Sequence, residues 1–336
     1  MTIYMVLLAF YAWGWRLAAQ KRKELGHQPD PVRVSVVVPA RNEGANIATC
    51  LRGLAAQQYP AELLEIIVVN DASEDHTAEI VKEIAAHDAR VKLVNLMAEK
   101  HLSAHKKRAI EAGIGAAGGQ LILCTDADCV HGPTWVGLMA QAYAGGAKKF
   151  VAAPVVYRTH PTLLSVFQTL DFLTLQGITA ASVASGFHTM CNGANIAYER
   201  DVFYEVDGFR GIDKLPTGDD MLLMYKVYRR YPAGIAYLLD PDAIVVTDAA
   251  PGWRAFFQQR IRWASKAAYY DDKRIFWVLM LVYFFNLWML GLGFASIWVT
   301  TALWYFLALL VIKTLAELAF IWPVASFFGK KKWLPW

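Results

Sequence analysis

Runs of apolar residues divide the chain into three parts. About 18 mostly apolar residues open the sequence, and the stretch from Ile275 to Phe328 is almost wholly apolar. A membrane-spanning helix needs about 20 such residues. Between these runs, short apolar stretches alternate with stretches of helical periodicity. The pattern predicts a transmembrane helix over residues 1–20, a soluble domain over 30–250, an interfacial amphipathic helix over 251–272, and two or three transmembrane helices over 275–328.

Charged residues flank the apolar runs. Lys21, Arg22 and Lys23 follow the first run, and Lys330–Lys332 follow the last. Lysine and arginine are enriched in cytoplasmic loops. We therefore expect a multi-pass membrane protein with its soluble domain in the cytoplasm, at the inner membrane in a bacterium. A cleaved signal peptide would carry its charges before the apolar run. The abrupt start leaves open that the sequence is a fragment, and a third C-terminal span would need residues beyond Trp336.

Two details of the C-terminal run can be predicted. A tight turn near Gly291–Gly293 would place both charged ends of the run on the same side of the membrane. Lys313 and Glu317 lie one helical turn apart, so we expect them to pair, although charges inside a membrane are also functional candidates.

Four short apolar runs lie in the soluble part, at Val34–Val38, Leu64–Val69, Val91–Leu96 and Gln120–Cys124. Apolar runs without polar alternation are typical of parallel strands that are covered on both faces. Helices are predicted between them, over residues 45–57, 76–87 and 103–117. This alternation predicts an α/β fold with a mostly parallel, doubly wound sheet.

Polar side chains follow three of these strands. Asp126 and Asp128 come after the fourth strand, Glu43 after the first and Asp71 after the second. Ligands of open α/β sheets bind beyond the carboxyl ends of the strands. Two carboxylates there form a hard oxygen site suited to Mg²⁺ or Mn²⁺ carrying a diphosphate, or else an acidic loop that only turns the chain. No G-x-G-x-x-G or Walker A sequence marks a dinucleotide or P-loop site.

The composition agrees with a membrane protein. Hydrophobic residues make up 56% of the chain, and it contains 12 Trp and 15 Tyr. The net charge of +4 lies mostly beside the apolar runs. It therefore favours membrane lipids with acidic headgroups over nucleic acid. The four cysteines show no zinc spacing and are expected to be reduced thiols.

Seven motifs together carry a family resemblance. In order they are VSVVVPARNE, IIVVNDASEDHT, SAHKKRAIEAGI, ILCTDAD, CNGANIAYER, TGDDMLL and QRIRW, within residues 33–265. In this order they resemble the family 2 glycosyltransferases, which are inverting enzymes with an A-type glycosyltransferase fold. The chain is similar to the membrane-embedded branch with a Q-x-x-R-W motif, which includes cellulose, chitin and poly-N-acetylglucosamine synthases and ceramide glucosyltransferases.

The resemblance implies a nucleotide-sugar site at the strand ends. Pro39, Arg41 and Glu43 would line the nucleoside pocket, and Asp71 would contact uracil or ribose. Lys106 is a candidate for the phosphate or uracil side, although His105 stands where the family often has Gly. Lys107 and Arg108 are expected on a solvated helix face.

The same resemblance makes Asp128 the direct metal ligand and Asp126 a contact to metal or ribose. Cys129, His131 and His101 are expected to be packing or loop residues, because Mg²⁺ does not need soft or imidazole ligands.

Catalytic and acceptor residues follow in the second half of the resemblance. Asp220 matches the family's catalytic base, with Asp219 as the second choice because Asp replaces the usual Glu. Capping of the next helix is the alternative role of this pair. Asn192, in the small-residue segment Cys191–Asn195, would lie near the donor sugar or the acceptor.

The Q-x-x-R-W residues are Gln259, Arg262 and Trp263. Gln259 and Arg262 share a helix face. Arginine can bind diphosphate in a fork, and tryptophan offers a platform for a sugar. The helix also has the aromatic and basic residues of a bilayer surface helix, and both roles are compatible.

The implied function is metal-dependent inverting transfer from a nucleotide sugar, in the first place a UDP-sugar, to a lipid or a growing glycan. A processive synthase that secretes its product is the alternative enzyme, and it would need more helices from a homo-oligomer or a partner membrane subunit. A non-catalytic membrane subunit that binds nucleotide sugar is the alternative from another class.

Overall fold

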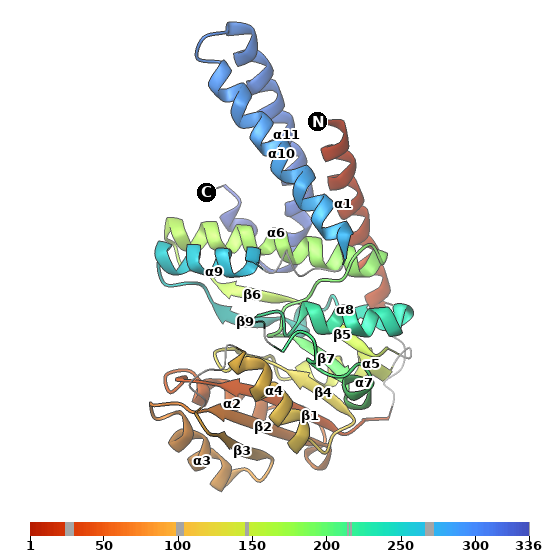
Figure 1. Cartoon of the computed structure of the whole chain (residues 1–336), viewed down its shortest axis with the longest axis vertical. Helices are drawn as coiled ribbons and strands as arrows, with labels where there is room; N and C mark the ends of the chain where they lie inside the picture. The colour runs from red at the N-terminus through yellow and green to blue at the C-terminus, as the bar shows by residue number, and fades with distance from the viewer. Residues whose placement is uncertain are drawn as a thin grey trace.

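The computed structural model describes residues 1–23, 30–98, 104–144, 148–213, 215, 217–265 and 272–335. Figure 1 shows a sheet domain at one end and long helices that protrude at the other. Two helices, α6 (Leu163–Ser185) and α9 (Trp253–Ser265), lie crosswise between these parts.

The central sheet begins with the four predicted strands. They are β1 (Val34–Ala40), β2 (Leu64–Asp71), β3 (Val91–Leu96) and β4 (Leu121–Cys124), and all are parallel. Three further strands, β5 (Phe150–Ala152), β7 (Ile196–Glu199) and β8 (Ile235–Tyr237), extend it in the order β3-β2-β1-β4-β7-β5-β8. Only β7 runs antiparallel to its neighbours. The mostly parallel α/β sheet is therefore confirmed, and its strand order reverses between β1 and β4, where such sheets bind ligands.

Helices cover both faces of this sheet. They are α2 (Ile47–Ala55), α3 (Thr77–His87), α4 (His105–Ala116), α5 (Trp135–Ala144), α7 (Arg200–Glu205) and α8 (Met221–Arg230). Val36 and Val38 of β1 belong to the core that contains α2, whereas Val37 belongs to the core on the α4 side. Successive side chains of a strand point to opposite faces, so an apolar run without alternation is what a sheet covered on both sides requires.

A second, two-stranded sheet joins the main sheet to the crosswise helices. It pairs β6 (Val155–Arg158) with β9 (Val245–Asp248) in parallel. The loop after β4 reaches it through an isolated bridge between Val130 and Val246. The loop that carries Asp126 and Asp128 is therefore fixed on both sides.

The long helix α6 was not predicted. Thr162 caps its start, accepting the Ser165 amide at 3.3 Å, and Gly186 ends it with φ +69°. Residues on several sides of α6 are buried, so the segment has no clear apolar stripe. It packs closely on the ends of the long helices: a Cβ at Gly177 would stand 2.8 Å from Val324.

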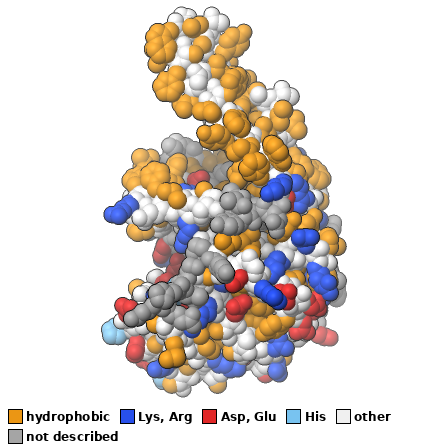
Figure 2. Space-filling model, in the orientation of Figure 1, with side chains coloured by type: hydrophobic (Ala, Val, Ile, Leu, Met, Phe, Trp, Pro, Cys, Tyr) orange, Lys and Arg blue, Asp and Glu red, His pale blue; other side chains and the backbone are white. Residues whose placement is uncertain are grey.

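Three helices are long and apolar enough to span a membrane: α1 (Thr2–Lys23), α10 (Lys273–Ala295) and α11 (Thr300–Phe327). Figure 2 shows apolar side chains over their protruding part and charged ones over the sheet domain. As predicted, Lys313 Nζ pairs with Glu317 at 2.7 Å, and Tyr4 of α1 also donates to Glu317. The predicted turn at Gly291–Gly293 is wrong. The helix continues through Gly293, which leaves room for the Phe306 ring, and the chain turns at residues 296–299.

Beneath the acidic loop lies a buried histidine. His131 Nε2 bonds Thr125 Oγ1 at 2.7 Å, and its ring centre lies 4.4 Å from that of Trp135. Burial lowers the pKa of His131 to about 3. His131 and the fully buried Cys129 are thus packing residues, as expected. His101 lies outside the described residues.

A single added methyl group tests the packing of α1 on α6. A Cβ at Gly14 would stand 2.7 Å from the Ala181 carbonyl oxygen. We expect Gly14→Ala to lower stability by about 1–3 kcal/mol. A Cβ at Gly115 in α4 meets nothing within 4 Å, so Gly115→Ala should raise stability by up to about 1 kcal/mol. Thermal unfolding in detergent measures both, and shifts of the same sign would contradict this packing.

His131 also makes stability depend on pH. The unfolded chain binds a proton at this imidazole below the ordinary histidine pKa of 6.5, whereas the folded protein does so only near 3. Stability should therefore fall as pH drops from 6.5 towards 3, by up to about 1.4 kcal/mol per pH unit. Unfolding midpoints between pH 7 and 5 measure this, and the slope should be shallower in His131→Gln. An unchanged slope in that variant would contradict a buried neutral imidazole.

Candidate active site

Acidic residues from separate elements meet around one lysine. Asp126 follows β4, and Asp219 precedes α8. Lys106, in the first turn of α4, places its Nζ 2.6 Å from Asp126 Oδ1 and 3.4 Å from Asp219 Oδ2. Although burial opposes it, the charges of Asp126 and Asp219 raise the pKa of Lys106. The structure thus brings together three predicted site residues that are up to 113 positions apart in the chain.

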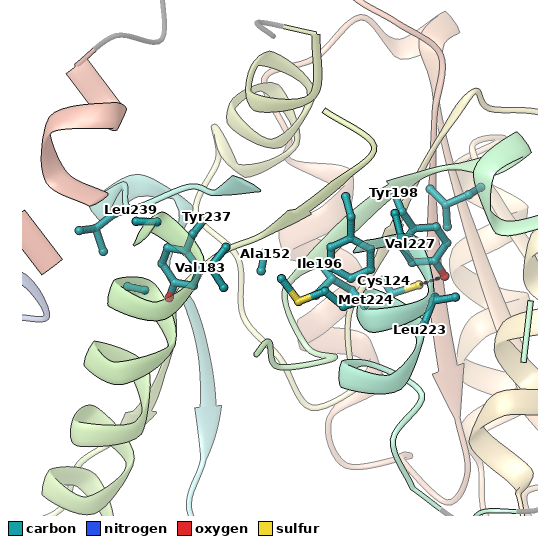
Figure 3. Packing of buried hydrophobic residues seen from close by; sticks show 14 of the residues in the cluster. Cys124, Ala152, Val183, Ile196, Tyr198, Leu223, Met224, Val227, Tyr237 and Leu239 are labelled. Atoms are coloured by element: carbon teal, nitrogen blue, oxygen red, sulfur yellow. Dashed lines mark hydrogen bonds between the residues drawn. The ribbon is translucent and has the colours of Figure 1, made fainter. Parts of the chain in front are cut away.

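The packing of α8 places Asp219 and Asp220. Figure 3 shows Leu223, Met224 and Val227 of α8 in the buried cluster that also contains Cys124, Ile196 and Tyr198 of the sheet. Tyr198 Oη lies 3.1 Å from the sulfur of Cys124, the last residue of β4. The first turn of α8 is therefore held next to the end of β4, where the acidic loop begins.

Asp220 is the N-cap of α8. Its Oδ1 accepts the Met221 amide at 2.7 Å, and its Oδ2 accepts the Gly193 amide at 3.2 Å. A Cβ at Gly193 would stand 3.2 Å from Asp219 Oδ2 and 3.5 Å from Lys106 Nζ. The small-residue segment thus approaches the acidic group closely, as only small residues allow. The capping role of Asp220 is real, and it fixes the carboxylate at the site.

Within the small-residue segment, two asparagines have structural contacts. Asn192 Oδ1 accepts the Ala194 amide at 3.0 Å. Asn195 is fully buried, donates to the carbonyls of Pro154 and Ala243, and accepts from Trp135 Nε1. Asn195 therefore fixes the backbone beside the site.

The expectation for Lys107 is wrong. Lys107 is buried, and its Nζ donates to the carbonyls of Ile212, Leu215 and Thr217 at 2.7, 2.7 and 2.8 Å. Arg108 is half-buried and donates to the Met97 carbonyl. The face of α4 that carries Lys107 meets the loop before Asp219, and three carbonyls satisfy the buried ammonium group. Lys106 and Lys107 together therefore connect α4 to the segment that precedes α8.

The acidic loop carries excess negative charge. Burial and the neighbouring Asp126 raise the pKa of Asp128, while Thr247 Oγ1 donates to its Oδ2 at 3.1 Å. Burial also raises the pKa of Glu43, with smaller contributions from Asp128 and Asp126. A cation bound here would relieve this repulsion.

The donors present fit Mg²⁺ or Mn²⁺ together with a substrate. Mg²⁺ is usually held by one or two carboxylates plus substrate phosphates and water. Asp126 and Asp128 supply such carboxylates. Among the described residues, no group of three or more His, Cys, Asp or Glu is placed to hold an ion.

The end of β2 forms the other side of the site. Asp71 is buried, and its Oδ2 lies 3.1 Å from His105 Nδ1 and 3.6 Å from Arg41 Nη1. Pro39 is half-buried in β1, beside Val69 of β2. Asn70 bonds Asn95 and the Ser73 amide, so its side chain stabilises the turn after β2. His105 is a candidate that sequence reasoning missed, and only its contact with Asp71 reveals it.

The Q-x-x-R-W residues lie in α9, whose predicted extension over 266–271 lies outside the described residues. Trp263 is half-buried, with its ring centre 6.2 Å from that of Phe172 in α6. Gln259 Oε1 is buried and has no hydrogen-bond partner among the described residues, and Arg262 is exposed. Arg260 stacks over Trp263 at 4.2 Å and pairs with Asp171 of α6. The structure therefore places α9 against α6, with Arg260 rather than Arg262 between them.

Comparisons with known proteins address the family and the fold of the chain. The profile of Glycosyl transferase family 2 matches residues 35–207. A probable glycosyltransferase of Bacillus subtilis, YdaM, is 28% identical over 70% of this chain and 56% of its own. A poly-beta-1,6-N-acetyl-D-glucosamine synthase of Staphylococcus epidermidis is 24% identical over 69% and 54%. The chain thus spans about half the length of these curated relatives.

Two further proteins are similar over a larger share of their own length. The glycosyltransferase AglE of Haloferax volcanii is 30% identical over 65% of this chain and 67% of its own. A mannosyltransferase of Pyrobaculum calidifontis, solved with GDP-Man and Mn²⁺, superposes with a TM-score of 0.58 at 22% identity. The superposition covers 98% of this chain and 95% of that one and shows a shared fold. The matched profile covers more than half of the sequence, and the chain belongs to glycosyl transferase family 2.

Proposed function

We propose that this protein is a membrane-bound, metal-dependent inverting glycosyltransferase that uses a nucleotide sugar, in the first place a UDP-sugar. The observation that carries the proposal is the position of Lys106 between Asp126 and Asp219. A metal-bound diphosphate at this place would have an ammonium group beside its phosphates and carboxylates beside its metal. The mannosyltransferase solved with GDP-Man and Mn²⁺ supports a nucleotide sugar and a divalent ion.

The strand ends would hold the donor. Pro39, Arg41 and Glu43 would line the nucleoside, and Asp71, next to Arg41, would accept from the base or ribose. Asp128 and Asp126 would hold Mg²⁺ or Mn²⁺, which stabilises the diphosphate leaving group. Lys106 would turn from Asp126 to a phosphate when the metal binds.

Asp220 would accept the proton of the acceptor hydroxyl. Two amides fix its orientation, whereas Asp219 faces the Lys106 ammonium at 3.4 Å. We therefore place Asp220 as general base and Asp219 as the residue that orients Lys106. Asn192 would lie near the sugar.

The acceptor would be a lipid or a growing glycan that reaches the site from the α6–α9 side. Trp263, Gln259 and Arg262 would contact the acceptor or the diphosphate there. Within the described part of the chain, the buried Gln259 Oε1 has no partner, and a ligand hydroxyl could satisfy it. The described residues contain three candidate spans, which favours a lipid or a short glycan. A secreting processive synthase would need helices from further copies or from a partner.

Asp220→Asn separates catalysis from binding and from folding. Asparagine caps a helix as well as aspartate does, so the fold should persist. We expect turnover to fall by about 10²–10⁴-fold, the range for loss of a general base, while the nucleotide Kd changes little. Nucleotide release and calorimetry measure the two quantities. Asp201→Asn, at a residue whose side chain is 76% exposed, is the matched control. Normal turnover in Asp220→Asn together with loss in Asp219→Asn would move the base to Asp219.

Asp128→Asn tests the metal site independently of turnover. The amide keeps the size of the side chain and can still accept from Thr247. We expect Mn²⁺ affinity in the presence of UDP to fall at least about tenfold, because the ion loses a charged ligand. Electron paramagnetic resonance of free Mn²⁺ measures this. Equal Mn²⁺ binding by Asp128→Asn and Asp201→Asn would contradict the assignment.

A further inference from the structure

A cavity of about 390 Å³ opens where β6 runs into α6 and β9 runs towards α9. Its lining includes Arg158, His160, Ser165, Gln168 and Asp248. This volume lies within the usual range of small-molecule sites. None of the residues proposed for the donor, the metal or the base lines it.

Two residues of the cavity lining, Arg158 and Asp248, point away from the acidic loop. Thr247 in β9 donates to Asp128, so its side chain points towards the metal site. The next residue, Asp248, pairs in register with Arg158 of β6. Because successive strand residues point to opposite faces, Arg158 and Asp248 point away from Asp128. The cavity is therefore a second site.

Buried side chains of α6 hold the walls of the cavity in place. Gln168 is 1% exposed and bonds both backbone groups of Ala250, donating at 2.9 Å and accepting at 3.1 Å. Ser165 Oγ, also buried, accepts the His160 amide at 2.9 Å. The segment between β6 and α6 and the segment after β9 are thus both bonded to α6. The walls of the cavity are therefore in place before a ligand binds.

One basic side chain lines the cavity, and a second lies beside it. Arg158 is more than half exposed and lies 3.5 Å from Asp248, and such an exposed pair contributes little. Lys330 donates to Thr159 Oγ1 at 2.9 Å, beside Arg158, and Lys331 and Lys332 follow it. Burial and the charge of Lys332 lower the pKa of Lys330. An anion in the cavity would offset this repulsion.

The cavity also lies at the level where the candidate spans end. Lys21, near the end of α1, donates to the Ala184 carbonyl of α6, and α11 ends against α6 at Val324. Figure 1 shows α6 and α9 side by side across the base of the long helices. Beside the cavity, Leu163, Phe167 and Trp253 are exposed, and the rings of Phe167 and Trp253 lie 6.0 Å apart. Exposed aromatic residues next to basic ones are typical of a bilayer surface.

We propose that this cavity binds the phosphate headgroup of an anionic membrane lipid. Arg158 and Lys330 contact the phosphate, Asp248 accepts from a headgroup hydroxyl, and the acyl chains lie along Leu163, Phe167 and Trp253. The bound lipid holds the α6–α9 layer at the membrane surface. This site is separate from donor binding and does not depend on the proposed sugar transfer.

The test measures lipid binding by the full chain in neutral detergent without nucleotide. Phosphatidic acid and phosphatidylcholine, each with a fluorescent acyl chain, are the probes. We expect phosphatidic acid to bind at least about tenfold more tightly, and Arg158→Ala with Lys330→Ala to remove this preference, because charge-assisted hydrogen bonds are lost. Arg158→Lys should keep part of it. Arg158 is exposed and Lys330 is half-buried, and the unfolding midpoint of each variant checks folding.

Arg254→Ala is the matched control. Arg254 is exposed in the first turn of α9 and outside the cavity lining, so this variant should keep the preference for phosphatidic acid. An equal loss in Arg254→Ala would show general attraction to charge and overturn the proposal, as would equal binding of the two lipids. Displacement of phosphatidic acid by millimolar inorganic phosphate would overturn it in favour of a free anion. Nucleotide binding, measured separately, reports on the donor site alone.

Discussion

The site depends on how the protein tolerates several carboxylates in one place. Asp126, Asp128 and Asp219 converge from two elements, and burial together with the charge of Asp126 raises the pKa of Asp128. Lys106 offsets part of this charge directly. Lys107, one residue further along α4, is buried and holds the chain that leads to Asp219. Adjacent lysines on one helix thus have different tasks, since one faces the carboxylates and the other fixes the loop that carries them.

The membrane and the site are connected through α6. Its Gly177 and small residues such as Ala181 let α11 and α1 approach closely, while its polar residues bond to β6 and to the segment before α9. The small sheet that α6 covers also holds Asp128, through Thr247. A rigid connection therefore runs from the candidate spans to the acidic loop. Such a connection would keep the site at a constant height above the membrane surface, where a lipid acceptor would be found.

Much of the fold could be predicted because its determinants are local. The strands β1, β2, β3 and β4 are short apolar runs bounded by turns, and each lies within three residues of its expected bounds. By contrast, α6 is buried on several sides and has no apolar period to detect. The strands β5, β7 and β8 are only three or four residues long, too short for a pattern.

Some residues of the candidate site could likewise be predicted from the sequence, and others could not. The aspartates could be predicted because they follow strands or open a helix in recognisable motifs. The burial of Lys107 could not, since its partners lie 105 or more positions later. The contact of His105 with Asp71 likewise joins the start of α4 to the end of β2, which only the tertiary fold brings together. For α9, the motif suggested Arg262, whereas packing on α6 selects Arg260 for the inner face.

The most direct test of the central claim is nucleotide release by the purified full chain. UDP- and GDP-sugars would be supplied one at a time, with Mn²⁺, Mg²⁺ or a chelator, and with or without a membrane lipid extract. We predict release from one sugar nucleotide, stopped by the chelator and increased by the lipid extract. If protein that binds nucleotide measurably released none from any sugar nucleotide of the panel, this result would contradict a catalytic role and favour a binding subunit.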